Sequence, residues 1–443
     1  MSKFTYFISL VTTMSLFSSP ALAQQLPEHG IFILNSLLFL IAGFLVMFMA
    51  CGFCMLEAGL VRSKNTTMQL TKNISLFSLA AVGYYIIGYN LMYPLGNWTI
   101  EGFLSGYIIP IKDTALLESV GINPENVDDL SYASTGSDYF FQLMFCAATA
   151  SIVSGTIAER VKLWPFLLFT LILTAIIYPL SASWTWGGGF LSEAGFSDFA
   201  GSTIVHSCGG WAALAGAIVI GPRIGRYIGG KTIPMPGANL PLATLGTFIL
   251  WLGWFGFNGG SQLAMGTVGD VADISRIFAN TNAAAAGGVL SAIIATQLYY
   301  GKVDLTMALN GALAGLVSIT AEPLAPSLGA ATLIGGVGGL LVVFTVPLLD
   351  KFKIDDVVGA IPVHLIAGIW GTLAVVFNNS EASFVTQIYG IVVIGAFSFA
   401  ASLLVFYIIS ATIGLRSSKE EEIQGLDKAE LGMDAYPEFL KSS

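Results

Sequence analysis

The sequence is divided into eleven apolar runs, most of them long enough to cross a lipid bilayer as an α-helix. Such a helix needs about 20 predominantly apolar residues. Only 10% of the residues are charged, whereas a soluble domain carries roughly a quarter charged residues. The sequence therefore predicts an all-α membrane protein with eleven transmembrane helices. The predicted spans lie near residues 31–56, 74–95, 137–158, 163–182, 200–221, 239–258, 277–300, 305–321, 328–349, 358–378 and 386–414, and the eighth is the shortest.

The two ends of the chain differ from the apolar runs between them. Residues 1–23 have the features of a secretory signal peptide: Lys3, then an apolar segment, then an Ala-x-Ala site that ends at Ala23. Cleavage after Ala23 is expected to leave the mature N-terminus outside. Residues 24–414 form the predicted membrane domain, and the polar residues 415–443 form a tail.

Positive charge is distributed unequally between the two sides of this topology. With the N-terminus outside, fifteen of the 18 Lys and Arg residues fall in inner loops or in the tail, and Lys72 is assigned to such a loop. The outer loops contain only Lys112 and Arg276. Cytoplasmic loops carry such an excess, so the C-terminus is predicted to be cytoplasmic. The net charge of −9 offers no basic surface for nucleic acid, and no such partner is expected.

One phrase occurs twice in the chain, as DFAGSTIVH (Asp198–His206) and DVVGAIPVH (Asp356–His364). A glycine follows each histidine four residues later, at Gly210 and Gly368. The first phrase opens the fifth span and the second opens the tenth, so they enter the membrane from opposite faces. This predicts an inverted repeat of spans 1–5 and 6–10 plus a final helix, an arrangement that places a substrate site near the midplane.

Each histidine lies eight residues beyond its aspartate, which is about 12 Å deeper along a helix. His206 and His364 are therefore expected to meet near the centre of the bilayer, where an ionisable residue indicates function. Two neutral rings can share one hydrogen bond, and the pair could accept a proton from a passing cation or bind a small polar molecule. A packing role for each histidine and a bis-His haem or quinone site remain alternatives. The last would make the chain a membrane redox protein.

Other polar residues in the apolar runs have simpler interpretations. Asp198 and Asp356 stand at helix starts, where a carboxylate caps backbone N–H groups. Asp198 could also attract a cation from the outer side. Cys51 and Cys54 form a C-x-x-C, but no second pair or nearby histidine completes a metal site, and none is expected.

Long segments of the chain resemble the Amt/Mep/Rh family of ammonium transporters, and its bacterial Amt members in particular. The resemblance implies a homotrimer in the inner membrane, with eleven helices and one pore in each subunit. It also implies ammonium or ammonia as cargo, methylammonium as a further one, no cofactor and no enzyme activity. A PII-type regulatory protein at the cytoplasmic face is a further implied partner. The matching segments are DFAGSTIVHSCGGWAALAGAIVIGPR, GTIAERVKLWPF, SWTWGGGFL, LGWFGFNGGSQL and DDVVGAIPVHLIAGIWGTL.

The same resemblance implies roles for individual residues. Phe145 and Phe257 match two gate phenylalanines, and Ser261 matches a serine that recruits ammonium. The twin pore histidines match His206 and His364, with Asp198 as the supporting acid. The resemblance also implies that Trp186 is the vestibule tryptophan and that Trp254 is an additional pore-lining residue. Gly359 stands where many relatives have aspartate, so only a structural role is implied for Asp356.

The resemblance leaves a second function open, because related chains act as ammonium sensors. Such sensors often carry a kinase or cyclase module, whereas this tail has only residues 415–443. The redox alternative with His206 and His364 as ligands belongs to a different class of protein. The first expectation is an ammonium transporter.

Overall fold

The computed structural model describes residues 26–106 and 130–439. The predicted signal peptide, residues 1–23, lies outside the described residues. The first half contains α2 (Glu28–Leu60), η1 (Ser63–Asn65), α3 (Thr66–Gly83), η2 (Tyr84–Gly88), α4 (Tyr89–Met92), β1 (Trp98–Ile100), β2 (Leu104–Ser105), α6 (Thr135–Thr156), α7 (Leu163–Ile172), η3 (Leu173–Ile177), α8 (Tyr178–Ser183), α9 (Phe190–Glu193), η4 (Ser202–Ser207) and α10 (Cys208–Ile220). The second half contains β3 (Tyr227–Ile228), β4 (Lys231–Thr232), α11 (Leu240–Gly260), α12 (Val268–Tyr300), α13 (Leu305–Thr320), α14 (Leu328–Lys351), η5 (Ile361–Ile366), α15 (Ala367–Ala374), η6 (Val375–Phe377), α16 (Phe384–Thr412), α17 (Lys419–Gln424), α18 (Leu426–Leu431) and η7 (Pro437–Phe439).

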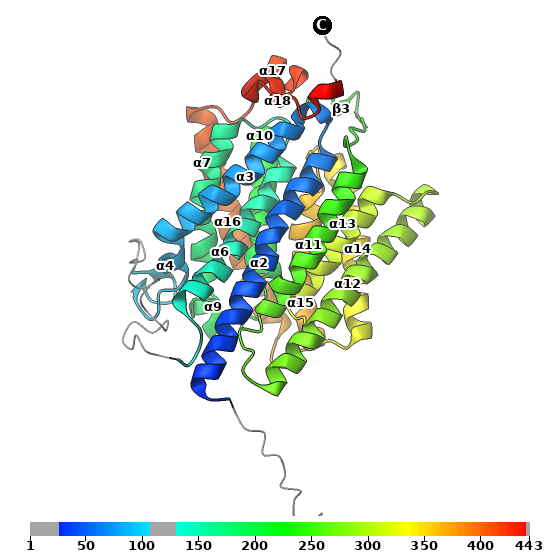
Figure 1. Ribbon diagram of the computed structural model, residues 1–443. Helices are drawn as coiled ribbons and strands as arrows, with labels where there is room; N and C mark the ends of the chain where they lie inside the picture. The colour runs from blue at the N-terminus through cyan, green and yellow to red at the C-terminus, as the bar shows by residue number, and fades with distance from the viewer. Residues whose placement is uncertain (1–25, 107–129, 440–443) are drawn as a thin grey trace, which may run out of the picture.

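The chain folds as a bundle of apolar helices, as the sequence predicts (Figure 1). In the described part of the chain, nine helices are long and apolar enough to cross a membrane. Two shorter apolar helices, Leu305–Thr320 and Ile361–Phe377, occupy the places of the eighth and tenth predicted spans. The two small hairpins, β1–β2 and β3–β4, lie in connections between helices.

The predicted start of the second span is wrong. The apolar helical segment runs over Ser63–Met92, so Lys72 lies inside a helix and not in a loop. Its side chain is only 1% exposed. A hydropathy window penalises a lysine whatever surrounds it, whereas here the ammonium group donates to the Gln69 side chain and to the Ser154 carbonyl oxygen.

Helices α2 and α11, the first of each predicted half, run antiparallel and pack closely (Figure 1). The end of α2 lies beside the start of α11, since Asn239 donates its N–H to the Gly59 carbonyl oxygen at 3.0 Å. Glycines allow the close approach: a Cβ at Gly59 would lie 2.5 Å from the Asn239 carbonyl oxygen, and one at Gly52 would lie 2.9 Å from the Leu250 nitrogen. Small residues at such crossings are typical of membrane helices, which gain little hydrophobic driving force from one another.

The tail folds back over one end of the bundle, which we call the tail face (Figure 1). Asp427 accepts hydrogen bonds from the backbone N–H groups of Thr67 and Met68, at the start of α3. Glu430 accepts one from the N–H of Leu163, at the start of α7. The first N–H groups of a helix have no partner within it, so the tail supplies carboxylate caps to two helices.

Candidate functional site

Each copy of the repeated phrase turns the chain sharply into a helix. The shared glycines, Gly201 and Gly359, have φ angles of 105° and 80°, a left-handed conformation that favours glycine. Asp198 accepts hydrogen bonds of 2.7–2.9 Å from the N–H groups of residues 202, 203 and 204. Asp356 accepts from the N–H groups of Gly359 and Ile361. Both carboxylates therefore cap the start of a half-helix.

The histidines lie on π-helical turns that follow these caps. His206 belongs to η4 and His364 to η5, and the regular helices α10 and α15 begin only after these turns. The two segments cross at Gly210 and Gly368, the glycines that follow each histidine by four residues. A Cβ at Gly210 would lie 2.7 Å from the Leu365 nitrogen, and one at Gly368 would lie 2.5 Å from the Ser207 hydroxyl oxygen. The glycine four residues after each histidine thus permits the crossing.

The crossing brings the two histidines together. Nδ1 of His364 lies 3.2 Å from Nδ1 of His206, and the ring centroids are 5.2 Å apart at an interplanar angle of 21°. One ring must donate and the other accept in this hydrogen bond. A second link joins the halves nearby, where the hydroxyl groups of Thr203 and Thr372 lie 2.7 Å apart.

Aromatic rings surround His206 and continue away from the tail face. The indole of Trp254 stacks on His206 with centroids 4.9 Å apart, and the ring of Phe257 lies at 5.2 Å. Phe145 packs on Phe257 at 4.1 Å, and Trp186 meets Phe145 edge to face at 6.0 Å. The predicted gate and vestibule residues therefore form one continuous column that ends at the histidine pair.

The polar residues of the predicted outer site lie at the far end of this column. Ser261 follows the last residue of α11, is half-buried, and donates its hydroxyl to the Phe257 carbonyl oxygen at 2.8 Å. The indole N–H of Trp186, also half-buried, donates to the Asp198 carbonyl oxygen at 3.2 Å. Asp198 is 3% exposed: its carboxylate accepts the backbone N–H groups that begin the His206 turn, and its carbonyl oxygen accepts the Trp186 indole.

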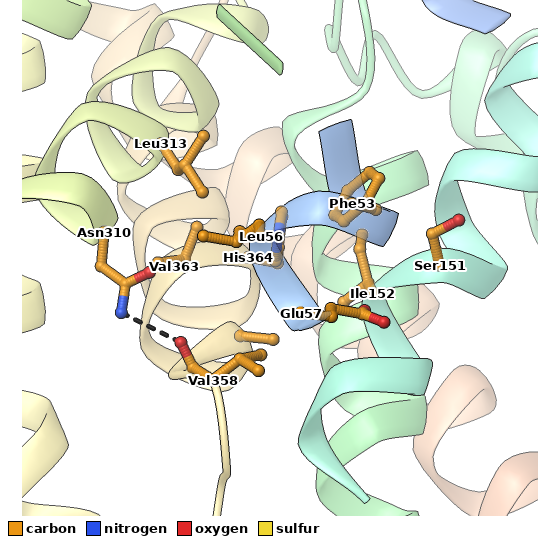
Figure 2. A pocket seen from close by; sticks show the side chains of 11 residues that line it. Phe53, Leu56, Glu57, Ser151, Ile152, Asn310, Leu313, Val358, Val363 and His364 are labelled. Atoms are coloured by element: carbon orange, nitrogen blue, oxygen red, sulfur yellow. Dashed lines mark hydrogen bonds between the residues drawn. The ribbon is translucent and has the colours of Figure 1, made fainter. Parts of the chain in front are cut away.

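A small cavity, with room for about one water molecule, lies beside the histidine pair (Figure 2). Its walls are mainly apolar and include Phe53, Ile152 and Leu313. His364 lines this cavity, with the centre of the Phe53 ring 6.0 Å from that of its own ring. Glu57 also lines the cavity (Figure 2).

Two features of the site, Phe53 and Thr320, have little or no signal in the sequence, whereas a third, Glu57, has one. Phe53 beside His364 is one of 30 phenylalanines. Thr320, which accepts the Trp254 indole N–H at 2.8 Å, is one of many hydroxyl residues in apolar runs. Glu57 had a usable signal, because an acid beside the long run 31–56 is uncommon in a membrane segment.

The cysteines take no part in the histidine site. All four cysteines are free thiols: Cys51 is exposed, Cys54 is half-buried, and Cys146 and Cys208 are buried. Among residues 26–106 and 130–439, no group of three or more His, Cys, Asp or Glu side chains is arranged to hold a metal ion.

We expect Asp198→Asn to lower both the melting temperature in detergent and the transport current of the reconstituted protein. The amide retains one oxygen for the three N–H groups that the carboxylate now accepts. An unsatisfied buried group costs about 1–3 kcal/mol. The same change at Asp304, which caps α13 at the N–H groups of residues 306 and 307, is the matched control. It should lower stability with little loss of current per folded molecule, and equal current losses in both variants would contradict a special role for Asp198.

Sequence comparisons connect this geometry with known proteins. A model of the "Ammonium Transporter Family" matches residues 37–436. The "Ammonium transporter Amt2" of Archaeoglobus fulgidus is 38% identical over 458 aligned positions, which cover 96% of this chain and 92% of that protein. The "Putative ammonium transporter sll1017" of Synechocystis sp. is 41% identical, over 90% of this chain and 88% of that protein.

Solved structures give the same result. A structure described as "Sensor Amt Protein" matches with a TM-score of 0.81 and 35% identity, covering 89% of this chain and 98% of the other. The crystal structure of Candida albicans Mep2 matches with a TM-score of 0.76 and 26% identity, covering 87% of both chains.

Proposed function

The chain belongs to the ammonium transporter family and is a multi-pass membrane protein that transports ammonium, and from this premise we propose a route for the cargo. Ammonium arrives at the end of the aromatic column, between Trp186 and Ser261. It gives up its proton at His206, and ammonia passes the histidine pair into the cavity beyond.

The outer end of the column can replace part of the water that ammonium loses. The faces of Phe145 and Trp186 can attract the cation by up to about 2 kcal/mol each once it is desolvated. Because the Ser261 hydroxyl donates its proton to the Phe257 carbonyl oxygen, its lone pairs are available to accept a hydrogen bond from ammonium. Asp198 contributes by holding Trp186 and the His206 turn in place.

The observation that carries the proposal is the unsatisfied ring nitrogen of His206. The side chain is fully buried, and Nε2 has no hydrogen-bond partner in the described part of the chain. If Nδ1 of His206 donates to Nδ1 of His364, then Nε2 presents a lone pair between Trp254 and Phe257. A buried acceptor without a partner is costly, and an N–H group of the cargo supplies that partner.

The same geometry accounts for selectivity. A potassium ion has no proton to give to His206, so it would have to cross the aromatic and aliphatic passage as a bare charge. Burying a charge without a partner is far more costly than burying neutral ammonia. We propose that methylammonium, which also carries N–H groups, follows the same route more slowly because of its size.

The proposal includes a topology and an assembly. We propose eleven spans with the mature N-terminus outside, a signal peptide removed after Ala23, and a cytoplasmic tail in the inner membrane. The antiparallel α2 and α11 and the opposed half-helices at His206 and His364 support an inverted repeat. A homotrimer with one pore in each subunit, embedded in lipid, and a PII-type protein at the tail face complete the proposal.

Reconstituted wild-type protein on a solid-supported membrane should produce a transient current when ammonium is added, and a much smaller one with potassium. Uptake of methylammonium into proteoliposomes provides a second measurement. If purified, folded protein gives neither current nor uptake, the ammonium sensor replaces this proposal. A Soret absorption band in the purified protein would instead support the bis-His redox alternative.

A further inference from the structure

We infer that Glu57 receives the proton that His364 releases and passes it on towards the tail face. This inference rests on the proposed proton transfer at the histidine pair and extends it by one residue. Once His206 has taken a proton at Nε2, its Nδ1 proton can pass across the 3.2 Å contact to Nδ1 of His364, which then needs an onward acceptor. Glu57 is a titratable side chain that lines the same cavity as His364 (Figure 2).

The spacing along α2 places Glu57 one helical turn beyond the histidine. Phe53 packs on the His364 ring, and Glu57 follows it by four residues on the same face of the helix. Four residues advance about 6 Å along a helix. This direction leads to the tail face, because α2 ends at Leu60.

Three side chains fix the Glu57 carboxylate through one of its oxygens. Oε2 accepts hydrogen bonds from Asn73 Nδ2 at 2.7 Å, from Ser154 Oγ at 3.0 Å and from the Gln69 side-chain amide. The other oxygen, Oε1, lies beside Gly155 and Val358: a Cβ added at Gly155 would lie 3.0 Å from Oε1 and 2.5 Å from a methyl group of Val358. The carboxylate is therefore held rigidly, with Oε1 next to the cavity that Val358 lines.

Lys72 supplies the compensating charge without a direct ion pair. Its ammonium group donates to Gln69 Oε1 at 3.1 Å and to the Ser154 carbonyl oxygen at 2.9 Å, and lies 4.7 Å from the centre of the Phe166 ring. Glu57 and Lys72 are 2% and 1% exposed. A buried charge is tolerated when it is paired and hydrogen-bonded. Because an amide bridges the two charges, Glu57 keeps an oxygen that can bind a proton.

Protonated His364 gives the proton on Nε2 to a carboxylate oxygen of Glu57, directly or through a water molecule in the cavity. The N–H bond breaks as the O–H bond forms, so imidazolium becomes neutral imidazole and the carboxylate becomes a carboxylic acid. Glu57 then loses this proton towards the tail face. Gln69 in the first turn of α3 and Ser154 in the last turn of α6 show that Glu57 lies near that end of the bundle.

The test measures current and internal pH in the same proteoliposomes, with a pH-sensitive dye inside. In the wild type, ammonia and its proton both arrive, so a current flows and the internal pH changes little. With Glu57→Gln the current should fall at least tenfold, while ammonia that arrives alone takes up protons and raises the internal pH. A loss of transport through altered packing would abolish both signals, so the sign of the pH change separates the two explanations.

Removing only the acid leaves Lys72 buried without its partner, which is strongly destabilising. The double variant Glu57→Gln/Lys72→Met removes both charges and should fold while still lacking the current. Glu57→Asp retains a carboxyl group and should restore a measurable part of the current. Thr170→Val is the matched control, because Thr170 is buried, its hydroxyl group donates to the Phe166 carbonyl oxygen of its own helix, and it does not line the cavity.

The outcomes distinguish this inference from the function on which it rests. A folded Glu57→Gln or double variant with the wild-type current and an unchanged internal pH overturns the role of Glu57. If the same preparation also keeps its current after both histidines are replaced, the proposed function fails as well. If the current is lost only without the histidines, the proposed function stands and this inference alone is wrong.

Discussion

Replacing both His206 and His364 with alanine should reduce the ammonium-dependent current by about two orders of magnitude or more, as is typical when a proton-transferring side chain is removed. The expectation follows from the 3.2 Å contact between the two Nδ1 atoms and from the unsatisfied Nε2 of His206. Without the rings, the aromatic column ends in an apolar gap that offers no proton acceptor. Solid-supported-membrane currents in ammonium and in potassium measure the effect.

The chain contains its own control for this experiment. His29 is the third histidine, and it lies exposed in the first turn of α2, away from the pair. His29→Ala should leave the current unchanged. An undiminished ammonium current in the double variant, measured at equal amounts of folded protein, would refute the proton transfer at His206 and leave the histidines only a role in pore shape.

The helices and the repeated phrase could be predicted from the sequence because their physics is local. Long apolar runs form helices in lipid, where every backbone polar group must be bonded within the segment. The phrase contains an aspartate that caps, a glycine with positive φ, a histidine, and a second glycine at a crossing. The role of each of these residues depends mainly on residue type and spacing, so the roles can be predicted from both copies of the phrase.

Features that depend on distant contacts could not be predicted in this way. The π-helical turns of His206 and His364 consist of the same kinds of residue as an ordinary α-helix. A π-helix differs in which carbonyl oxygen accepts each N–H group, and hydropathy contains no information about that choice. Hydropathy places Lys72 in a loop, because it does not record that a partner of this lysine lies in α6, more than 80 residues away. Asp427 and Glu430 in the tail cap α3 and α7, and no local sequence pattern predicts these contacts.

Replacing Asp355 with alanine should produce the largest loss of stability outside the histidine site. Asp355 is 1% exposed and accepts two hydrogen bonds from the Arg223 guanidinium group and one from its backbone N–H, all at 2.8–2.9 Å. Arg160, fully buried, donates to the Asp355 carbonyl oxygen at 2.7 Å. Breaking a buried charge pair costs about 3–5 kcal/mol, and the Glu159 carboxylate, 3.2 Å from the Arg223 guanidinium group, compensates only part of the charge that is left. The melting temperature in detergent should therefore fall by several degrees.

Asp350→Ala is the matched control for this loss. Asp350 pairs with Arg226 at 2.9 Å, but the side chains of the two residues are 21% and 15% exposed. Ion pairs in contact with water contribute about 0–1 kcal/mol. The control should therefore melt close to the wild type. If Asp350→Ala lowers the melting temperature as much as Asp355→Ala, burial of the Asp355–Arg223 pair does not explain why that pair stabilises the protein.

The pH dependence of the Asp355 effect provides an independent test. Burial alone would raise the pKa of the Asp355 carboxyl, but the hydrogen bonds from Arg223 and the charge of Arg160 outweigh it and hold this pKa well below its usual range. A carboxyl with a lowered pKa in the folded state contributes fully above its unfolded pKa of about 3.9, and the contribution is lost as the pH falls through the folded-state value. The difference in melting temperature between wild type and Asp355→Ala should therefore be constant near neutral pH and narrow in strong acid. A difference that grows on acidification would show that Asp355 is not held as an ionised partner of Arg223.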